Sequence, residues 1–189
     1  MTKLPSQSAY KPTAIALHWL MGLVLAVTFA LGLYMADMPL SPDKLRYYSW
    51  HKWIGVSLFM LAAVRLAVRL TSPHTLAGGS RSLQESLALW AHRILYLLMF
   101  AIPLSGWLMS SAKGVPTVYL GLWQLPDLVG RNAVLGRSLQ TLHVTLNFTM
   151  AVIVIGHVAA ALKHHFVDHD GVLARMLPCV EPRSSGKPS

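Results

Sequence analysis

The sequence predicts an all-α integral membrane protein built as a four-helix bundle. Its mean hydropathy is +0.49, and 54% of its 189 residues are hydrophobic while only 12% are charged. The apolar residues gather in four stretches, each close to the ~20 residues that a helix needs to cross a bilayer. We expect these spans at residues 14–36, 50–70, 87–109 and 139–162.

Each span has its own supporting signal. The first carries no charged side chain from Ala14 to Ala36, which is too long for a signal-peptide core, so we expect it to remain in the protein. The second opens beside the aromatic cluster Tyr47, Tyr48, Trp50 and Trp53, as at a membrane boundary. The connections 37–49, 71–86 and 110–140 are expected to be loops, and Pro103 is expected to kink the third span. The expected organisation is a polar lead at 1–13, a membrane domain at 14–165 and a tail at 166–189.

The charged residues flank the spans. The formal net charge is +9, but the basic residues lie between and beyond the apolar stretches, which indicates contact with membrane lipid and argues against nucleic acid. The side with both termini carries ten basic residues: Lys3, Lys11, Arg65, Arg69, Arg81, Arg93, Lys163, Arg175, Arg183 and Lys187. The other side carries six: Lys44, Arg46, Lys52, Lys113, Arg131 and Arg137. Both termini are therefore predicted to be cytoplasmic.

Histidines mark two depths in the bundle. His143 and His157 are fourteen residues apart on the fourth span, which places both rings on one helix face about 21 Å apart. With four spans, His18 lies at the depth of His157, and His51 lies at the depth of His143. Intramembrane histidines are candidates for function, although each ring alone could simply be a hydrogen-bonded interior residue.

Two opposed imidazoles at each depth favour bis-histidine haem b, a cofactor that lies flat between helices. Zinc lacks its four ligands here, whereas copper held by histidine and methionine remains an alternative. The lone Cys179 excludes a four-cysteine iron–sulfur site and the C-x-x-C-H haem attachment motif. His92 and His164 also lie on the cytoplasmic side and compete as ligands. Gly22 and Gly55 each follow a histidine by four residues and would leave a notch beside its ring.

Several short segments around the histidines form a distinctive combination: Ile15-Ala16-Leu17-His18-Trp19-Leu20, Ser49-Trp50-His51-Lys52, Val64-Arg65-Leu66 with Arg69, His92-Arg93-Ile94-Leu95-Tyr96-Leu97-Leu98, Leu142-His143, His157 and Lys163-His164-His165-Phe166. In these segments the sequence resembles the bacterial cytochrome b561 family, and the resemblance extends over residues 9 to 178. It implies two haem b groups, with iron held by His18 and His157 on the cytoplasmic side and by His51 and His143 on the outer side. It also implies an oxidoreductase of respiratory electron transport in the bacterial inner membrane, with superoxide oxidised outside and ubiquinone reduced.

Further roles follow as hypotheses. Arg65, fourteen residues after His51, could neutralise a propionate of the inner haem, or could be an arginine that reaches the headgroups. His164, alone or together with His92, could contact the quinone, or could face water. Lys52 and Arg46 could steer superoxide, or could bind headgroups.

Three other functions remain open at this stage. The chain could be an anchor subunit that accepts electrons from a partner dehydrogenase or hydrogenase. It could also be a histidine-lined metal or proton transporter, or a structural membrane subunit whose histidines lie in the interior. Absorption bands from a reducible haem would support either the cytochrome that oxidises superoxide or the anchor subunit. Their absence would favour the transporter or the structural subunit.

Overall fold

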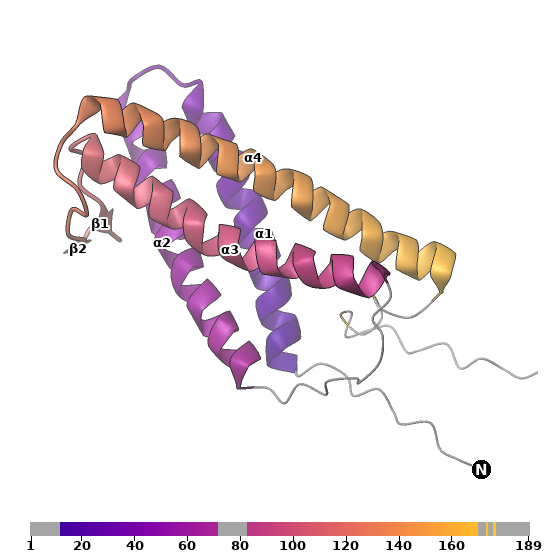
Figure 1. Ribbon diagram of the computed structural model, residues 1–189. Helices are drawn as coiled ribbons and strands as arrows, with labels where there is room; N and C mark the ends of the chain where they lie inside the picture. The colour runs from indigo at the N-terminus through magenta and orange to yellow at the C-terminus, as the bar shows by residue number, and fades with distance from the viewer. Residues whose placement is uncertain (1–11, 72–82, 170–172, 174–175, 177–189) are drawn as a thin grey trace, which may run out of the picture.

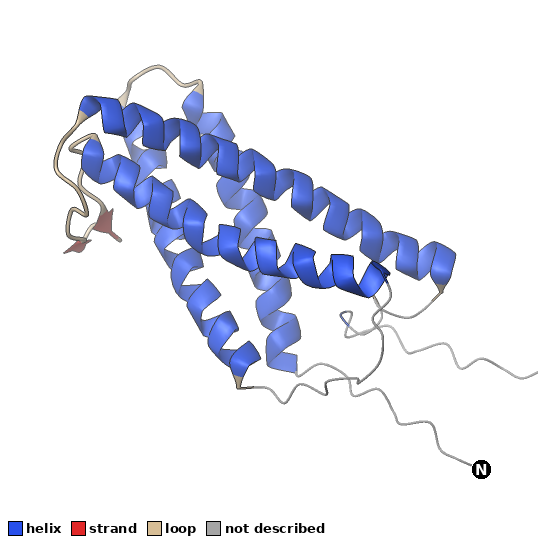
Figure 2. Ribbon diagram, viewed as in Figure 1, coloured by secondary structure: helices blue, strands red, loops and turns tan. Residues whose placement is uncertain are grey.

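The computed structural model describes residues 12–71, 83–169, 173 and 176. These form four long helices, α1 (Pro12–Ala36), α2 (Pro42–Leu70), α3 (Leu83–Ala112) and α4 (Ala133–Lys163), which Figure 1 shows as a bundle. Two short strands, β1 (Val118–Tyr119) and β2 (Trp123–Gln124), form a hairpin at one end, and a π-helix (His164–Asp168) follows α4 (Figure 2). All four long helices have the length and composition of membrane spans. The predicted all-α membrane bundle is confirmed.

All four helices begin earlier than the predicted spans, by the widest margins at α2 and α4, where a polar side chain caps the first turn. The Ser41 side chain accepts a hydrogen bond from the Lys44 backbone N–H at 3.2 Å, and Pro42 occupies the first turn. The expected loop 37–49 is therefore helical from Pro42 onward. At α4, the side-chain oxygen of Asn132 accepts from two backbone N–H groups at 3.0 Å each, so the helix begins at Ala133 inside the expected loop 110–140.

The expected lead, the 71–86 connection and the tail fall largely outside the described residues, as do six of the basic residues counted for orientation. These six are Lys3, Lys11, Arg81, Arg175, Arg183 and Lys187. Of the tail beyond the π-helix, the structure places Met176 against α1, where its carbonyl oxygen accepts a hydrogen bond from Trp19 Nε1 at 2.7 Å. The chain after α4 therefore returns to the first helix.

The helices pack as neighbours in chain order, α1 with α2, α2 with α3, and α3 with α4, and α3 and α4 run side by side in Figure 1. Small and flexible residues fill the interior, including Ala62, Met21 and Met150. By contrast, Leu23 and Val152 are 65% and 69% exposed, as expected of side chains that face lipid. α1 and α4 meet through side chains such as Phe29 and Phe148, whose ring centroids are 5.8 Å apart.

The hairpin loop is fastened to α2. Trp53 Nε1 donates to the Val118 carbonyl oxygen at 2.6 Å, and the Ser57 hydroxyl lies 2.9 Å from the Tyr119 hydroxyl. We call this end of the bundle the hairpin end and the opposite end, where α4 passes into the π-helix, the tail end. The hairpin thus covers one end of α2 near its histidine.

Candidate functional site

Two pairs of histidines face each other across the bundle, one pair near each end. At the hairpin end, the ring centroids of His51 in α2 and His143 in α4 are 6.2 Å apart. At the tail end, those of His18 in α1 and His157 in α4 are 6.1 Å apart. The structure therefore brings together the same two pairs that were grouped by depth in the sequence, each joining α4 to one of the first two helices.

The spacing within each pair suits two axial ligands of one metal atom. Metal–imidazole bonds of about 2 Å on opposite sides of a metal place the two ring centroids roughly 6 Å apart. Among the described residues, no three His, Cys, Asp or Glu side chains are grouped to hold a bare metal ion. Two nitrogen ligands per site fit a macrocycle that supplies the four equatorial ligands itself. The residues present therefore fit b-type haem.

His143 is held by α3 in the orientation that a ligand needs. Its Nδ1 lies 3.0 Å from the Ile102 carbonyl oxygen and 3.0 Å from the hydroxyl oxygen of the buried Ser105. The Ser105 hydroxyl itself donates to the Ile102 carbonyl at 2.7 Å. Nδ1–H is thus the donor to this pair of oxygens, which leaves Nε2 as the atom with a free lone pair. A backbone carbonyl behind the imidazole is the usual support of a metal-bound histidine.

Two glycines allow the hairpin-end rings to approach neighbouring helices. A Cβ atom on Gly32 would lie 3.2 Å from His51 Cε1, and a Cβ on Gly106 would lie 3.0 Å from His143 Cε1. Both contacts are tight, so a side chain at either position would require the neighbouring ring to shift by a few tenths of an ångström. His51 Nδ1 is buried without a hydrogen-bond partner among the described residues.

Gly22 and Gly55, the two glycines singled out in the sequence, do not contact a histidine ring in the way that Gly32 and Gly106 do. A Cβ on Gly22 or on Gly55 would meet nothing within 4 Å, so each faces open space. That is consistent with a notch for a flat group. Sequence reasoning missed Gly32 and Gly106, although a usable signal existed: Gly32 follows His18 by fourteen residues and Gly106 follows His92 by fourteen. This is the same spacing that joins His143 to His157.

The tail end gathers three imidazoles and a guanidinium. The ring of His92 in α3 lies 5.3 Å from that of His157, and its Nδ1 is 2.7 Å from the Ala88 carbonyl oxygen. Arg65 Nη2 lies 3.1 Å from His18 Nδ1, and Arg65 Nε donates to the Tyr96 hydroxyl at 3.1 Å. His92 thus remains close enough to His157 to compete with His18.

The Arg65 contact bears on its expected role. Because a guanidinium only donates hydrogen bonds, His18 Nδ1 accepts here and Nε2 carries the proton. A ring that binds metal through Nε2 carries its proton on Nδ1, so ligation by His18 requires Arg65 to turn away. The guanidinium would then be available to another acceptor at the same depth.

The other predicted residues lie at the two ends. His164 is in the π-helix, with Nδ1 3.2 Å from Asp168 Oδ2. Lys52 donates through Nζ to the carbonyl oxygens of Val115 and Pro116 at 3.3 and 3.2 Å, so its ammonium is engaged by the hairpin loop. Arg46 pairs loosely with Asp43 at 4.0 Å, both side chains being well exposed.

Another basic residue, Lys113, stands at the hairpin end beyond α3. Its ammonium donates to Gln140 Oε1 at 2.6 Å, and burial lowers the pKa of this group. Lys52, Arg46 and Lys113 together make this end basic.

Comparison with known proteins identifies the family. Residues 9–179 match the family model described as prokaryotic cytochrome b561. The chain is 36% identical to cytochrome b561 homolog 2 of Escherichia coli strain K12, covering 89% of this chain and 90% of the relative. It is 29% identical to the probable superoxide oxidase CybB of Yersinia pestis, over 89% and 96% of the two chains. It is 27% identical to cytochrome b561 homolog 1 of Escherichia coli strain K12, over 89% and 97%.

These matches extend over nearly the whole chain, and the fold agrees with them. The four helices and the paired intramembrane histidines are what a membrane protein of electron transfer through b-type haem requires. The chain belongs to the prokaryotic cytochrome b561 family of multi-pass bacterial membrane proteins.

Proposed function

We propose that this protein carries two b haems, one at each end of the bundle, and passes electrons from superoxide at the hairpin end to ubiquinone at the tail end. The observation that carries the proposal is the presence of two facing histidine pairs at opposite ends, each with ring centroids about 6 Å apart. Bound haem would supply one-electron redox chemistry at each depth. One site alone would not connect the two membrane faces.

The proposed ligands are His51 and His143 at the hairpin end and His18 and His157 at the tail end. His143 has the best support among the four. Its Nδ1 is engaged by Ile102 and Ser105, so Nε2 is the ring nitrogen that can bind the metal. At the tail end, Arg65 would neutralise a haem carboxylate once it leaves His18, since a buried carboxylate needs a charged partner.

The direction of transfer rests on orientation. The sequence predicts ten basic residues on the side with both termini, six of them outside the described residues, against six on the other side. This count favours a cytoplasmic tail end and an outward hairpin end. A basic outer rim favours a small anionic donor, and superoxide has that charge. One relative carries the name probable superoxide oxidase, which supports the same donor.

The proposed overall reaction balances as two superoxide anions, one ubiquinone and two protons giving two dioxygen molecules and one ubiquinol. The quinone therefore needs a proton source at the tail end. His164, at the end of α4, is the proposed contact, with His92 as a second candidate, because imidazole exchanges protons near neutral pH.

The test is reconstitution of the purified protein with ubiquinone and a steady source of superoxide. We expect one ubiquinol for every two superoxide anions consumed, with loss of this coupling in His143→Ala and retention in Ser49→Ala, whose hydroxyl only contacts its own helix. Ubiquinol oxidation in the absence of any superoxide activity would instead favour an anchor subunit for a partner dehydrogenase. A protein that reacts with neither substrate would contradict the proposal.

A further inference from the structure

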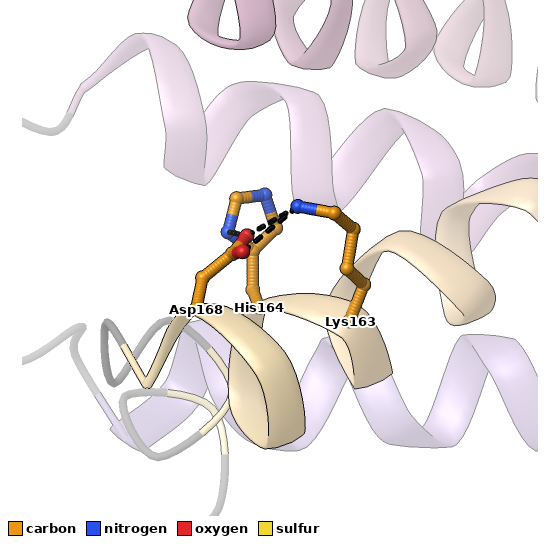
Figure 3. Close-up of polar contacts among 3 residues, drawn as sticks. All are labelled: Lys163, His164 and Asp168. Carbon is orange, nitrogen blue, oxygen red and sulfur yellow. Dashed lines mark hydrogen bonds and ion pairs between the residues drawn. The ribbon is translucent and has the colours of Figure 1, made fainter.

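The π-helix at the end of α4 gathers two basic side chains around one carboxylate. Lys163 Nζ donates to both oxygens of Asp168, at 2.9 and 2.6 Å, and His164 Nδ1 lies 3.2 Å from Asp168 Oδ2. Figure 3 shows the lysine and the imidazole converging on this carboxylate. Asp168 is therefore the centre of a cluster with one partner on each side.

The π geometry explains how this cluster forms. Residues five apart, such as Lys163 and Asp168, are separated by about 1.4 turns in an α-helix and point to different faces. The wider π turn, closed here by the His169 N–H donating to the His164 carbonyl oxygen, brings Lys163 onto the face of Asp168. His164, four residues from Asp168, would share that face on an α-helix as well. His169 then ends the turn in the left-handed conformation, with φ of 52°. π turns inside helices are frequently found at functional sites.

The cluster is half-shielded from water. The side chains of His164 and Asp168 are 26% and 29% exposed, whereas that of Lys163 is 52% exposed. The lysine thus balances the carboxylate from the solvent side, while the imidazole takes the less exposed position. If Nδ1–H is donated to Asp168, proton exchange with a ligand would take place at the other ring nitrogen of His164, Nε2.

We propose that Asp168, held by Lys163, is a positioning residue for His164 in proton transfer to the quinone. This inference rests on the proposed function. The carboxylate fixes the ring orientation and stabilises the imidazolium, as carboxylates do for catalytic histidines elsewhere. In quinone reduction, Nε2–H is given to a quinone oxygen and the ring regains a proton from water. In ubiquinol oxidation, the same Nε2 would take the proton, and bound haem would supply the electron acceptor.

The experiment follows ubiquinol oxidation, which needs no outer donor. The full-length purified protein is mixed with a short-chain ubiquinol, and its reduction is followed at the haem absorption bands over a range of ubiquinol concentrations. We expect Asp168→Asn to lower the limiting rate by about tenfold or more and to leave the half-saturating concentration nearly unchanged. Asp168→Glu keeps the charge and should recover most of the rate.

Control measurements distinguish a slower reaction caused by a misplaced His164 ring from one caused by a misfolded protein. Exposed ion pairs contribute little to stability, so Asp168→Asn should keep the cofactor content of the wild-type protein. Lys163→Met is the second variant, expected to slow the reaction in the same direction, and Asp127→Asn in the hairpin-end loop is the matched control with no expected effect. A larger solvent deuterium isotope effect in Asp168→Asn is also expected, because proton transfer then limits the rate.

The outcomes distinguish the inference from the function beneath it. If His164→Gln is slow while Asp168→Asn and Lys163→Met react at the wild-type rate, positioning by Asp168 is wrong and the quinone contact stands. If none of the three is slowed, the contact at His164 is wrong as well. If ubiquinol does not reduce the wild-type protein at all, the proposed function and this inference both fail.

Discussion

His143 in α4 is bound to the main chain of α3, because its Nδ1 lies 3.0 Å from the Ile102 carbonyl oxygen. The Ser105 hydroxyl joins this contact from the same helix. Hydrogen bonds behind a metal-bound imidazole raise its basicity and so favour the oxidised metal. We predict that Ser105→Ala raises the midpoint potential of the hairpin-end haem by about 30 mV, a fraction of the free energy of one hydrogen bond. A spectroscopic redox titration measures the shift.

The matched control for this prediction is Ser49→Ala, which removes a hydroxyl that bonds only to the Leu45 carbonyl of its own helix. It should leave both potentials unchanged. Equal potentials in Ser105→Ala and the wild-type protein would show that Ser105 does not act on the ligand.

Gly106→Ala should weaken cofactor binding at the hairpin end. The added methyl group would lie 3.0 Å from His143 Cε1 and 3.3 Å from its Nδ1, so the ring would have to move, which disturbs the contact of Nδ1 with the Ile102 carbonyl. Overpacking of this kind typically costs about 1–3 kcal/mol. Haem content per chain and the thermal unfolding midpoint are the measurements.

Gly130→Ala in the loop before α4 serves as the control, since a Cβ there meets nothing within 4 Å. If Gly106→Ala binds cofactor and unfolds as Gly130→Ala does, the close approach of His143 to α3 is not required.

Arg65→Gln should shift the potential of the tail-end haem alone. The guanidinium lies 3.1 Å from His18 Nδ1, and loss of a positive charge near the site favours the oxidised cofactor, so the potential should fall. The same titration resolves the two haems. An unchanged titration would support the alternative in which Arg65 only reaches the headgroups.

Superoxide consumption should slow as ionic strength rises, because salt screens the basic hairpin end. Arg46→Glu should lower the second-order rate by about 10-fold at low salt while cofactor content is kept. Its side chain is exposed and makes only a long contact with Asp43, so the change acts through charge. Lys52→Glu is less simple, since Lys52 also holds the hairpin loop. If the second-order rate of superoxide consumption changes neither with ionic strength nor in Arg46→Glu, electrostatic steering is wrong.

Much of the fold and the pairing of histidines could be predicted because helix geometry is periodic. Fourteen residues are close to four turns, so His143 and His157 share a face, and the span count then pairs each with a histidine from α1 or α2. The same spacing joins His18 to Gly32, His51 to Arg65, and His92 to Gly106. In the structure, one member of each pair lies at each end of the bundle.

Other features depended on contacts that no spacing reveals. The early start of α2 depends on the N-cap residue Ser41, and that of α4 on the N-cap residue Asn132. Both lie in polar stretches for which the sequence predicts loops. The support of His143 comes from the α3 backbone at Ile102. The contact of Lys163 with Asp168 needs a π turn, because a five-residue spacing would place these two residues on different faces of an α-helix.

The central claim is that each facing histidine pair holds one haem b, and haem stoichiometry of the purified protein tests it most directly. We predict two haems per wild-type chain, one in His51→Ala or His143→Ala, and one in His18→Ala or His157→Ala, with a different spectral component lost by each pair. His92→Ala should keep two, although its ring lies 5.3 Å from that of His157. A single haem in the wild-type chain, or loss of a haem in His92→Ala with both retained in His18→Ala, would contradict the account.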